Sequence, residues 1–468
     1  MSRRRRWKSR KRRTTPWGPI LVGLLLGVPL AAEVAARVLV STQTFQLQAP
    51  TEEATDLDIA EAYQLQFVTD GGEAYGPSGS LQAKHHPLMA YDLIPGQQNQ
   101  FWQINDQGFR DSESIPSTKP DGEIRIFVLG GSEAFGQLSS NNSTLFSSQL
   151  QQRLNQRVEE QLGNPGQFQP DILPYRADQV DEALALPPKI RVGQYRLINA
   201  AVPGYTSGNV LARLVYQISN YDPDIVIVMG GYADLLLPST ALSADIPNLN
   251  DFLRPQPLVP LDPQPKWNQW GQQMGSAAID RLYLAKVWNT YTAPLPEAKT
   301  PEPVRLVNLM VDNATAPVAT HVADGDELTQ RLDRYENNLL QIVRWISATQ
   351  KRMMVVLAPE VTGRDPDQIT PAETAILSDL GETYQTLLPQ AYAQLDARSQ
   401  NVAARSANVK VLNFYDLNAA PDSPLAQDPL FYGPNSLTDA GQTILADRLY
   451  AAMVSHLALQ PLPYGSRR

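Results

Sequence analysis

Residues 124–136 read IRIFVLGGSEAFG, and this stretch decides how the rest of the chain is interpreted. The apolar run from Ile124 to Leu129 stops at Gly130-Gly131, and Ser132 follows directly. A short continuous apolar run bounded by glycine is typical of a buried strand in a parallel sheet. Ligands bind beyond the carboxyl ends of such strands. Ser132 is therefore a candidate nucleophile, which requires a base, an orienting group and oxyanion donors elsewhere in the chain.

Further apolar runs alternate with segments expected to be helical. The expected strands are 124–129, 195–199, 224–229, 353–358 and 409–414, and the expected helices are 143–154, 207–221, 327–349, 371–395 and 437–456. The segment 327–349 has the strongest amphipathic pattern, with apolar residues three and four positions apart. Strands and helices that alternate in this way predict a three-layer α/β/α sandwich with a parallel sheet covered on both faces.

The composition excludes several kinds of site. The 468 residues include no cysteine, which rules out disulfides, cysteine-ligated metals and a thiol nucleophile. Only four histidines are present, and no GxxxxGK[ST] phosphate loop occurs, so we expect neither a metal nor a cofactor. Residues 3–13 carry nine positive charges, which leaves −18 on the remainder once they are taken from the net charge of −9. An acidic body argues against nucleic-acid binding.

The basic run is followed by an uncharged apolar segment, WGPILVGLLLGVPLAA, at residues 17–32. Further apolar residues extend it past Glu33 and Arg37 to residue 40. We interpret 17–40 as one uncleaved transmembrane helix, with a cleavable signal peptide as the alternative. The positive-inside rule then places the N-terminus in the cytoplasm and exports the C-terminal body to the periplasmic or extracytoplasmic side.

These patterns give a domain plan. We expect a basic cytoplasmic tail at 1–16, an anchor at 17–40, a stalk or linker at 41–86, a small β element at 87–123 and the α/β domain at 124–458, with insertions at about 156–192 and 238–325. Polar composition and clustered prolines mark the linker and the insertions.

Five blocks, taken in order, resemble the SGNH (GDSL-type) hydrolases, in particular their membrane-anchored bacterial branch. They are NDQGFR at 105–110, GGSEAFG at 130–136, AAVPGYTSG at 200–208, GGYAD at 230–234 and FYGPNSLTDAG at 431–441. The resemblance covers most of the chain from about 87 to 456. It implies a flavodoxin-like α/β fold and chemistry on ester bonds.

The resemblance also assigns roles to positions, and several positions hold the wrong residue. It puts the nucleophile on Ser132 and a backbone oxyanion donor on Gly204. In the block that begins at Gly231, the position of the side-chain donor is Ala233, and a methyl group donates no hydrogen bond. The aspartate and histidine positions of the last block fall on Gly433 and Ser436, and a serine hydroxyl is a negligible base near pH 7.

Two main hypotheses follow. In the first, the domain is catalytically impaired and binds an acylated glycan, lipid or protein partner in envelope assembly. In the second, it is an active serine esterase or acyl-transfer enzyme that uses Ser132 with a displaced base. A structural envelope protein, in which Ser132 only bonds the backbone of its turn, stays open as a third class.

The remaining polar candidates are assigned bland roles. The histidines are expected in an exposed loop, in the insertion and on the last helix, and the two aspartates are expected to cap a helix or hold a loop. These residues are His85, His86, His321, His456, Asp234 and Asp439.

Overall fold

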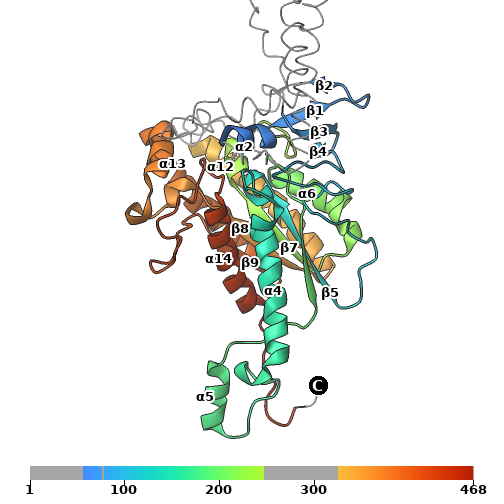
Figure 1. The fold of residues 1–468 in the computed structure, drawn as a ribbon, viewed down its shortest axis with the longest axis vertical. Helices are drawn as coiled ribbons and strands as arrows, with labels where there is room; N and C mark the ends of the chain where they lie inside the picture. The colour runs from blue at the N-terminus through green and yellow to red at the C-terminus, as the bar shows by residue number, and fades with distance from the viewer. Residues whose placement is uncertain (1–55, 76–78, 247–324, 467–468) are drawn as a thin grey trace, which may run out of the picture. The chain divides into compact units, whose positions relative to one another are not determined.

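The computed structural model describes residues 56–75, 79–246 and 325–466, and its centre is a five-stranded parallel sheet (Figure 1). The strand order is β6-β5-β7-β8-β9. Each strand agrees with its expected range to within one residue at either end: β5 (Glu123–Gly130), β6 (Gln194–Asn199), β7 (Ile225–Gly230), β8 (Arg352–Leu357) and β9 (Val409–Asn413). The prediction of a parallel α/β sheet is confirmed.

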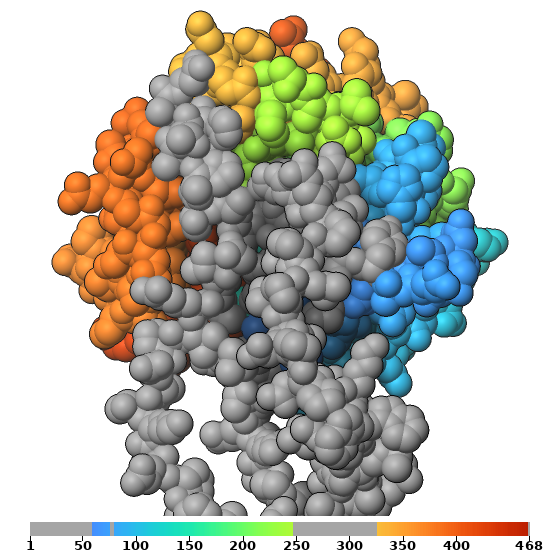
Figure 2. Space-filling view, turned by 90° about the horizontal axis from the view of Figure 1, so that it is seen from above, coloured from blue at the N-terminus to red at the C-terminus, as the bar shows by residue number. Residues whose placement is uncertain are grey.

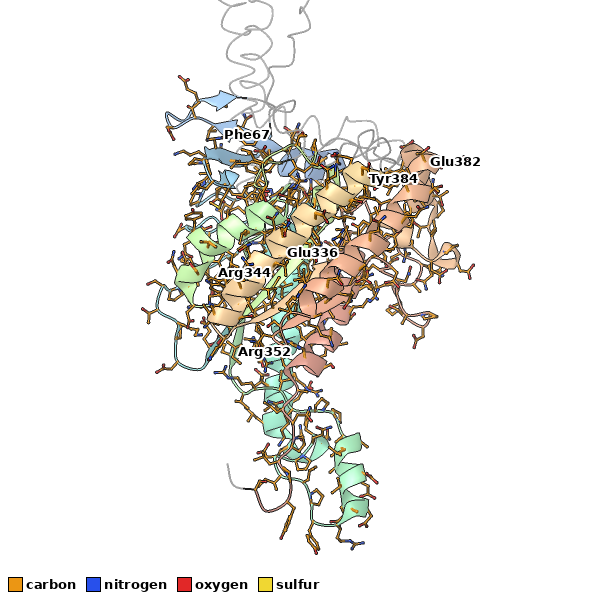
Figure 3. The ribbon with its side chains drawn as sticks, turned by 180° about the vertical axis from the view of Figure 1, so that it is seen from behind. Phe67, Glu336, Arg344, Arg352, Glu382 and Tyr384 are labelled. Atoms are coloured by element: carbon orange, nitrogen blue, oxygen red, sulfur yellow. The ribbon has the colours of Figure 1, made fainter. Side chains whose placement is uncertain are left out.

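Helices cover both faces of this sheet. Along β5, Ile126 and Val128 pack into one core, and Phe127 and Leu129 pack into the other. The first core is closed by α4 (Phe146–Gly163) and α14 (Asp439–Leu457), and the second by α6 (Ser207–Tyr216), α12 (Gly325–Ala348) and α13 (Pro371–Ala403). Figure 3 shows α12 and α13 side by side on the second face, where Arg398 of α13 pairs with Glu336 of α12 at 2.7 Å.

A second, four-stranded sheet differs from the expected linker at 41–86. Residues 56–63 form α2 (Asp56–Tyr63), and the sheet that follows has the order β2-β1-β3-β4, with β1 (Leu65–Val68), β2 (Ala74–Tyr75), β3 (Leu81–His86) and β4 (Ala90–Leu93). Leu65, Phe67, Leu81 and Ala83 alternate with more exposed neighbours and join the first core. The strands are too short and too polar on their outer side for the sequence pattern to reveal them.

The shorter helices complete the described part. They are α3 (Ser132–Phe135), α5 (Ala177–Ala185), α7 (Tyr232–Leu236), η1 (Asn142–Thr144), η2 (Pro165–Gln167), η3 (Ile218–Tyr221), η4 (Val361–Gly363) and η5 (Pro366–Gln368). The insertion expected at 156–192 begins within α4 and contains α5, in a lobe that projects beyond the sheet (Figure 1). Most of the second expected insertion lies outside the described residues.

The expected membrane anchor at 17–40 also lies outside the described ranges. Within those ranges, no helix combines the length and the apolar character that a membrane crossing needs.

Candidate active site at the carboxyl end of the sheet

Three strand-end loops meet around Ser132. A Cβ on Gly130 would lie 2.0 Å from the Met229 carbonyl oxygen, and one on Gly131 would lie 2.9 Å from the Tyr205 carbonyl oxygen. The ends of β5 and β7 and the loop after β6 are therefore in direct contact. Gly130 also has a φ of 156°, so only glycine fits this turn without strain. The glycine pair of the sequence pattern is explained by this close approach.

Ser132 begins the short helix α3, and its side chain is buried. The Gly204 N–H donates a hydrogen bond to Ser132 Oγ over 3.1 Å. The structure therefore brings the expected nucleophile and the expected backbone donor together. A backbone N–H beside the serine is suited to stabilise negative charge that develops on a bound carbonyl.

The donor loop is held by the small sheet. The Tyr91 hydroxyl of β4 donates to the Pro203 carbonyl, next to Gly204, and the Tyr205 hydroxyl donates to the Tyr91 carbonyl at 2.5 Å. Burial raises the pKa of Tyr205, so its hydroxyl keeps its proton and remains a donor. These tyrosines were missed in the sequence because their partners lie more than 110 positions away.

Arg110 fixes the other end of the nucleophile helix. Its guanidinium is buried and donates to the Phe135 and Gly136 carbonyl oxygens at 3.0 and 2.7 Å, where α3 ends. The same group donates to Ser139 Oγ at 2.9 Å and to the Tyr63 hydroxyl at 2.5 Å. Carbonyl groups at a helix end lack intrahelical partners, and Arg110 supplies them. The GFR motif thus has a positioning role that the sequence alone did not give.

In the fourth block, GGYAD, the position expected to hold a side-chain donor carries none. Gly231, with a φ of 110°, precedes α7, and Ala233 is buried within α7 and carries only a methyl group. Asp234 instead accepts hydrogen bonds from the Ser207 N–H and hydroxyl at the start of α6. Burial raises the pKa of Asp234. Its expected role in holding a loop matches this geometry.

The last block forms a tight loop at the same end of the sheet. The Tyr432 N–H donates to the Ser436 carbonyl at 2.9 Å, and the Val361 N–H, after β8, donates to the Pro434 carbonyl at 2.8 Å. A Cβ on Gly433 would lie 3.9 Å from Ser436 Oγ. The expected aspartate and histidine positions are thus neighbours, but neither carries a group that can accept a proton near pH 7.

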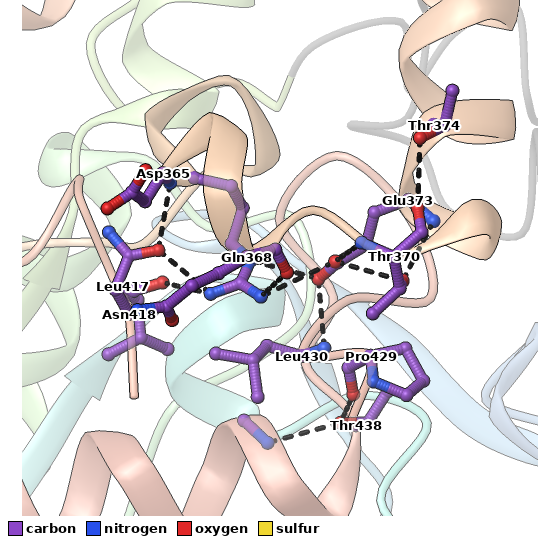
Figure 4. A network of polar contacts seen from close by, with 12 residues as sticks. Asp365, Gln368, Thr370, Glu373, Thr374, Leu417, Asn418, Pro429, Leu430 and Thr438 are labelled. Atoms are coloured by element: carbon purple, nitrogen blue, oxygen red, sulfur yellow. Dashed lines mark hydrogen bonds and ion pairs between the residues drawn. The ribbon is translucent and has the colours of Figure 1, made fainter. Parts of the chain in front are cut away.

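A buried ion pair fastens this loop to the fold, as Figure 4 shows. Glu373 pairs with Arg364 at 3.1 Å and accepts the Leu430 N–H at 2.9 Å. Thr438 donates to the Pro429 carbonyl at 2.7 Å and accepts the Gly441 N–H at 3.1 Å, so Thr438 is the N-cap of α14. The frame of the block is complete although its two chemical positions are not.

Asp439 has a different role from the expected helix cap. Its carboxylate accepts the Ser140 N–H at 3.0 Å, the Ser140 hydroxyl at 2.5 Å and the Thr144 hydroxyl at 2.9 Å. It therefore ties the start of α14 to the segment that follows α3. Three donors from a chain segment 295 to 299 positions away could not be read from the sequence.

The histidines do not supply an evident base among the described residues. His456 lies beside Arg352, whose guanidinium donates to the His456 carbonyl at 3.3 Å. Arg352 is the first residue of β8, and Figure 3 shows it far from Tyr384, toward the opposite end of the sheet and its covering helices. His85 and His86 end β3, where His86 Nδ1 accepts the Leu88 N–H at 3.2 Å. His321 lies outside the described residues.

A buried group of acids and tyrosines lies beside these loops and was not anticipated. The Glu360 carboxylate, just after β8, accepts the Tyr384 hydroxyl at 2.9 Å and the Thr362 N–H at 2.8 Å. The Tyr384 hydroxyl also lies 3.3 Å from that of Tyr232 in α7. Burial raises the pKa of Glu360 to about 7, so this acid titrates near neutrality.

A second carboxylate, Glu133, follows the serine directly. It is buried, and its oxygens lie 3.2 and 3.5 Å from the positions that Cβ atoms on Gly131 and Gly230 would occupy. Acidic side chains are therefore concentrated near Ser132. Within the described ranges, no three or more His, Asp or Glu residues are grouped so that they could hold a metal ion.

Comparison with known proteins adds little to this description. No family model and no curated protein matches the chain. Solved structures that resemble it include the acetyl xylan esterase AlAXEase (11% identity, TM-score 0.32, 70% of this chain and 99% of that one). Two others are the lipase/acylhydrolase from Enterococcus faecalis (13%, 0.30, 72% and 98%) and a lipolytic protein of the G-D-S-L family from Desulfitobacterium hafniense (10%, 0.31, 71% and 99%). At these scores the likenesses carry no argument.

Proposed function

We propose that this chain is a membrane-tethered, SGNH-hydrolase-like protein that binds an acylated glycan, lipid or protein partner and lacks the groups for efficient ester turnover. Its tether is the expected helix at 17–40, and its cleft is the carboxyl end of the sheet around Ser132. In this role the protein acts in envelope assembly rather than as a fast esterase.

One observation supports the proposal most strongly. The Ser132 hydroxyl lies beside the Gly204 N–H, while the positions for its base and orienting group hold Ser436 and Gly433. Attack by a serine requires a group that accepts its proton, and removal of base and orienter leaves only the residual rate from binding and the oxyanion donors. In the described part of the chain, the motif positions therefore keep a backbone donor beside the serine and hold no proton acceptor at the base position, which supports the proposal.

A panel of acetyl and short acyl esters tests this proposal on the full chain and its Ser132→Ala variant. We expect both proteins to hydrolyse the esters at indistinguishable, near-background rates. Ester turnover by the wild type that disappears in Ser132→Ala would overturn the hypothesis that the site is catalytically impaired. In that case, replacing His85, His86 and His321 by alanine one at a time identifies a displaced base, which is the alternative function of an active esterase or acyl-transfer enzyme.

A further inference from the structure

Buried side chains with no hydrogen bond at all cluster at the same end of the sheet. Within the described ranges, Gln137, Tyr392, Asn435 and Ser436 are at most 2% exposed, and none of their side-chain hydrogen-bonding atoms has a partner. Buried polar atoms are bonded in the great majority of cases, so each exception requires an explanation. Four such side chains near one candidate site point to a ligand.

The position of Asn435 and Ser436 supports this explanation. Both belong to the loop whose Pro434 carbonyl accepts the N–H of Val361, directly after β8. Asn435 occupies a turn, where asparagine ordinarily bonds its own backbone, yet both atoms of its amide lack a partner. Three and four residues after Asn435, the side chains of Thr438 and Asp439 form hydrogen bonds to the surrounding fold. The unbonded atoms are therefore confined to the tip of a firmly held loop.

The chemistry of the neighbouring groups limits the ligand. An amide and a hydroxyl each donate and accept, and they carry no charge. Burial, together with the nearby carboxylates of Glu360 and Glu133, raises the pKa of Tyr392, so two acids lie near one of the four unbonded side chains. An anionic ligand is disfavoured beside two acids, whereas neutral hydroxyl groups match both the donors and the acceptors.

We propose that Asn435 and Ser436 form a polar subsite that binds the hydroxyl groups of a neutral carbohydrate. This inference rests on the proposed binding function of the cleft and specifies its ligand as a glycan. Because both side chains are almost fully buried, the sugar reaches them only after the protein opens, and association is expected to be slow.

An oligosaccharide array tests the subsite with the full chain and three variants. The array carries neutral di- and trisaccharides, such as cellotriose and mannotriose, beside uronate counterparts such as trigalacturonate. We expect binding to neutral sugars only, weakened at least about tenfold in Asn435→Leu and in Ser436→Ala. Binding should be unchanged in Gly163→Ala, because Gly163 ends α4 and an added Cβ there meets nothing within 4 Å. Absence of neutral-sugar binding, or stronger binding of the uronates, would overturn the inference.

Thermal unfolding of the unliganded variants gives a readout that needs no ligand. Leucine has nearly the shape of asparagine, so Asn435→Leu removes two unbonded polar atoms and is expected to leave the Tm unchanged or raised. Asn199→Leu is the matched control, since Asn199 is equally buried but donates to the Ala134 carbonyl at 2.9 Å and accepts the Ala201 N–H at 3.1 Å. The control should lower the Tm.

A Tm loss in Asn435→Leu as large as in Asn199→Leu would show that Asn435 has a structural role and would overturn the subsite. The two proposals also fail separately. Efficient, Ser132-dependent ester turnover contradicts the impaired site and leaves the sugar subsite standing. Loss of sugar binding from a chain that is inert toward esters contradicts the subsite alone.

Discussion

The hydroxyl of Ser132 accepts the Gly204 N–H, and its own proton is the one that must leave before it can attack. Nothing in the motif positions assigned to base and orienter can take that proton. The carboxylates near the site do not replace an imidazole in an obvious way. Glu360 is already bonded by Tyr384 and Thr362, and burial holds its pKa at about 7.

The buried carboxyl of Glu360 is expected to make the free energy of unfolding depend on pH. Its ordinary pKa is 4.5 and its folded pKa is about 7, so between these values the folded state retains a proton that the unfolded state has lost. Stability should therefore fall as pH rises from about 5 to 7 and level off above this range, with a contribution on the order of 3 kcal/mol. Denaturant unfolding of wild type and Glu360→Gln across pH 5–8 measures it, and we expect the variant to lack this decline.

The test compares the stability-versus-pH curve of the wild type with that of Glu360→Gln. Only the difference between the two curves reports on Glu360, because burial also raises the pKa of Asp234 and makes stability fall with rising pH in both proteins. Parallel curves for wild type and Glu360→Gln would contradict the assignment.

At the scale of elements, the strand-to-helix turns position the site. Gly130 ends β5 just before α3, and a Cβ added there would lie 2.0 Å from the Met229 carbonyl oxygen, so any side chain there would displace β7. Gly130→Ala is expected to destabilise the fold by more than about 3 kcal/mol, since it adds a backbone clash to a strained φ. Equilibrium unfolding measures the loss.

Gly163→Ala provides the comparison. Gly163 ends α4, and a Cβ there would meet nothing within 4 Å. Alanine in that position should be neutral or stabilise by about 0.5–1 kcal/mol. Similar losses in the two variants would mean that the turn at Gly130 is not constrained as described.

The elements themselves were largely predictable, while the contacts that hold the site were not. The apolar runs and the spacing of Leu328, Leu332 and Tyr335 depend on neighbours in sequence, which is why β5 to β9 and α12 could be predicted. By contrast, Tyr91 and Arg110 act through carbonyl groups brought to them by the fold. The motif predicted the positions of Ser132 and Gly204, because glycine turns leave a sequence signature.

At the scale of the whole molecule, the site is assembled from distant segments. Residues of the small sheet, of the chain around α6 and of α13 appear on one face in Figure 2. The small sheet braces Gly204, α13 supplies Tyr384 and Glu373, and the final block reaches from α14. The backbone frame and the chemical side chains that it carries are separate features, so the frame can be complete while the chemical positions are not.

The proposed membrane tether gives a prediction for the full chain. Residues 17–32 are uncharged and largely apolar, further apolar residues extend them past Glu33 and Arg37, and nine positive charges precede them, so the protein should stay with the membrane fraction after alkaline carbonate extraction. A variant that lacks residues 1–40 should be released. Recovery of the full-length chain in the soluble fraction would contradict the tether, and recovery of a mature chain that starts after residue 32 would favour the cleaved-signal alternative.

The most direct test of the central claim is to restore the missing groups. Gly433 does not require a left-handed backbone, and a Cβ there meets only Ser436 at 3.9 Å, so a side chain can be accommodated. The combined variant Ala233→Asn, Gly433→Asp and Ser436→His supplies the donor, the orienter and the base. The measurement is kcat/KM for p-nitrophenyl acetate in this variant and in the wild type, each with and without Ser132→Ala. We predict a gain of at least about a hundredfold that depends on Ser132. A wild type that already shows Ser132-dependent turnover, and that gains nothing from the restored groups, would contradict the account.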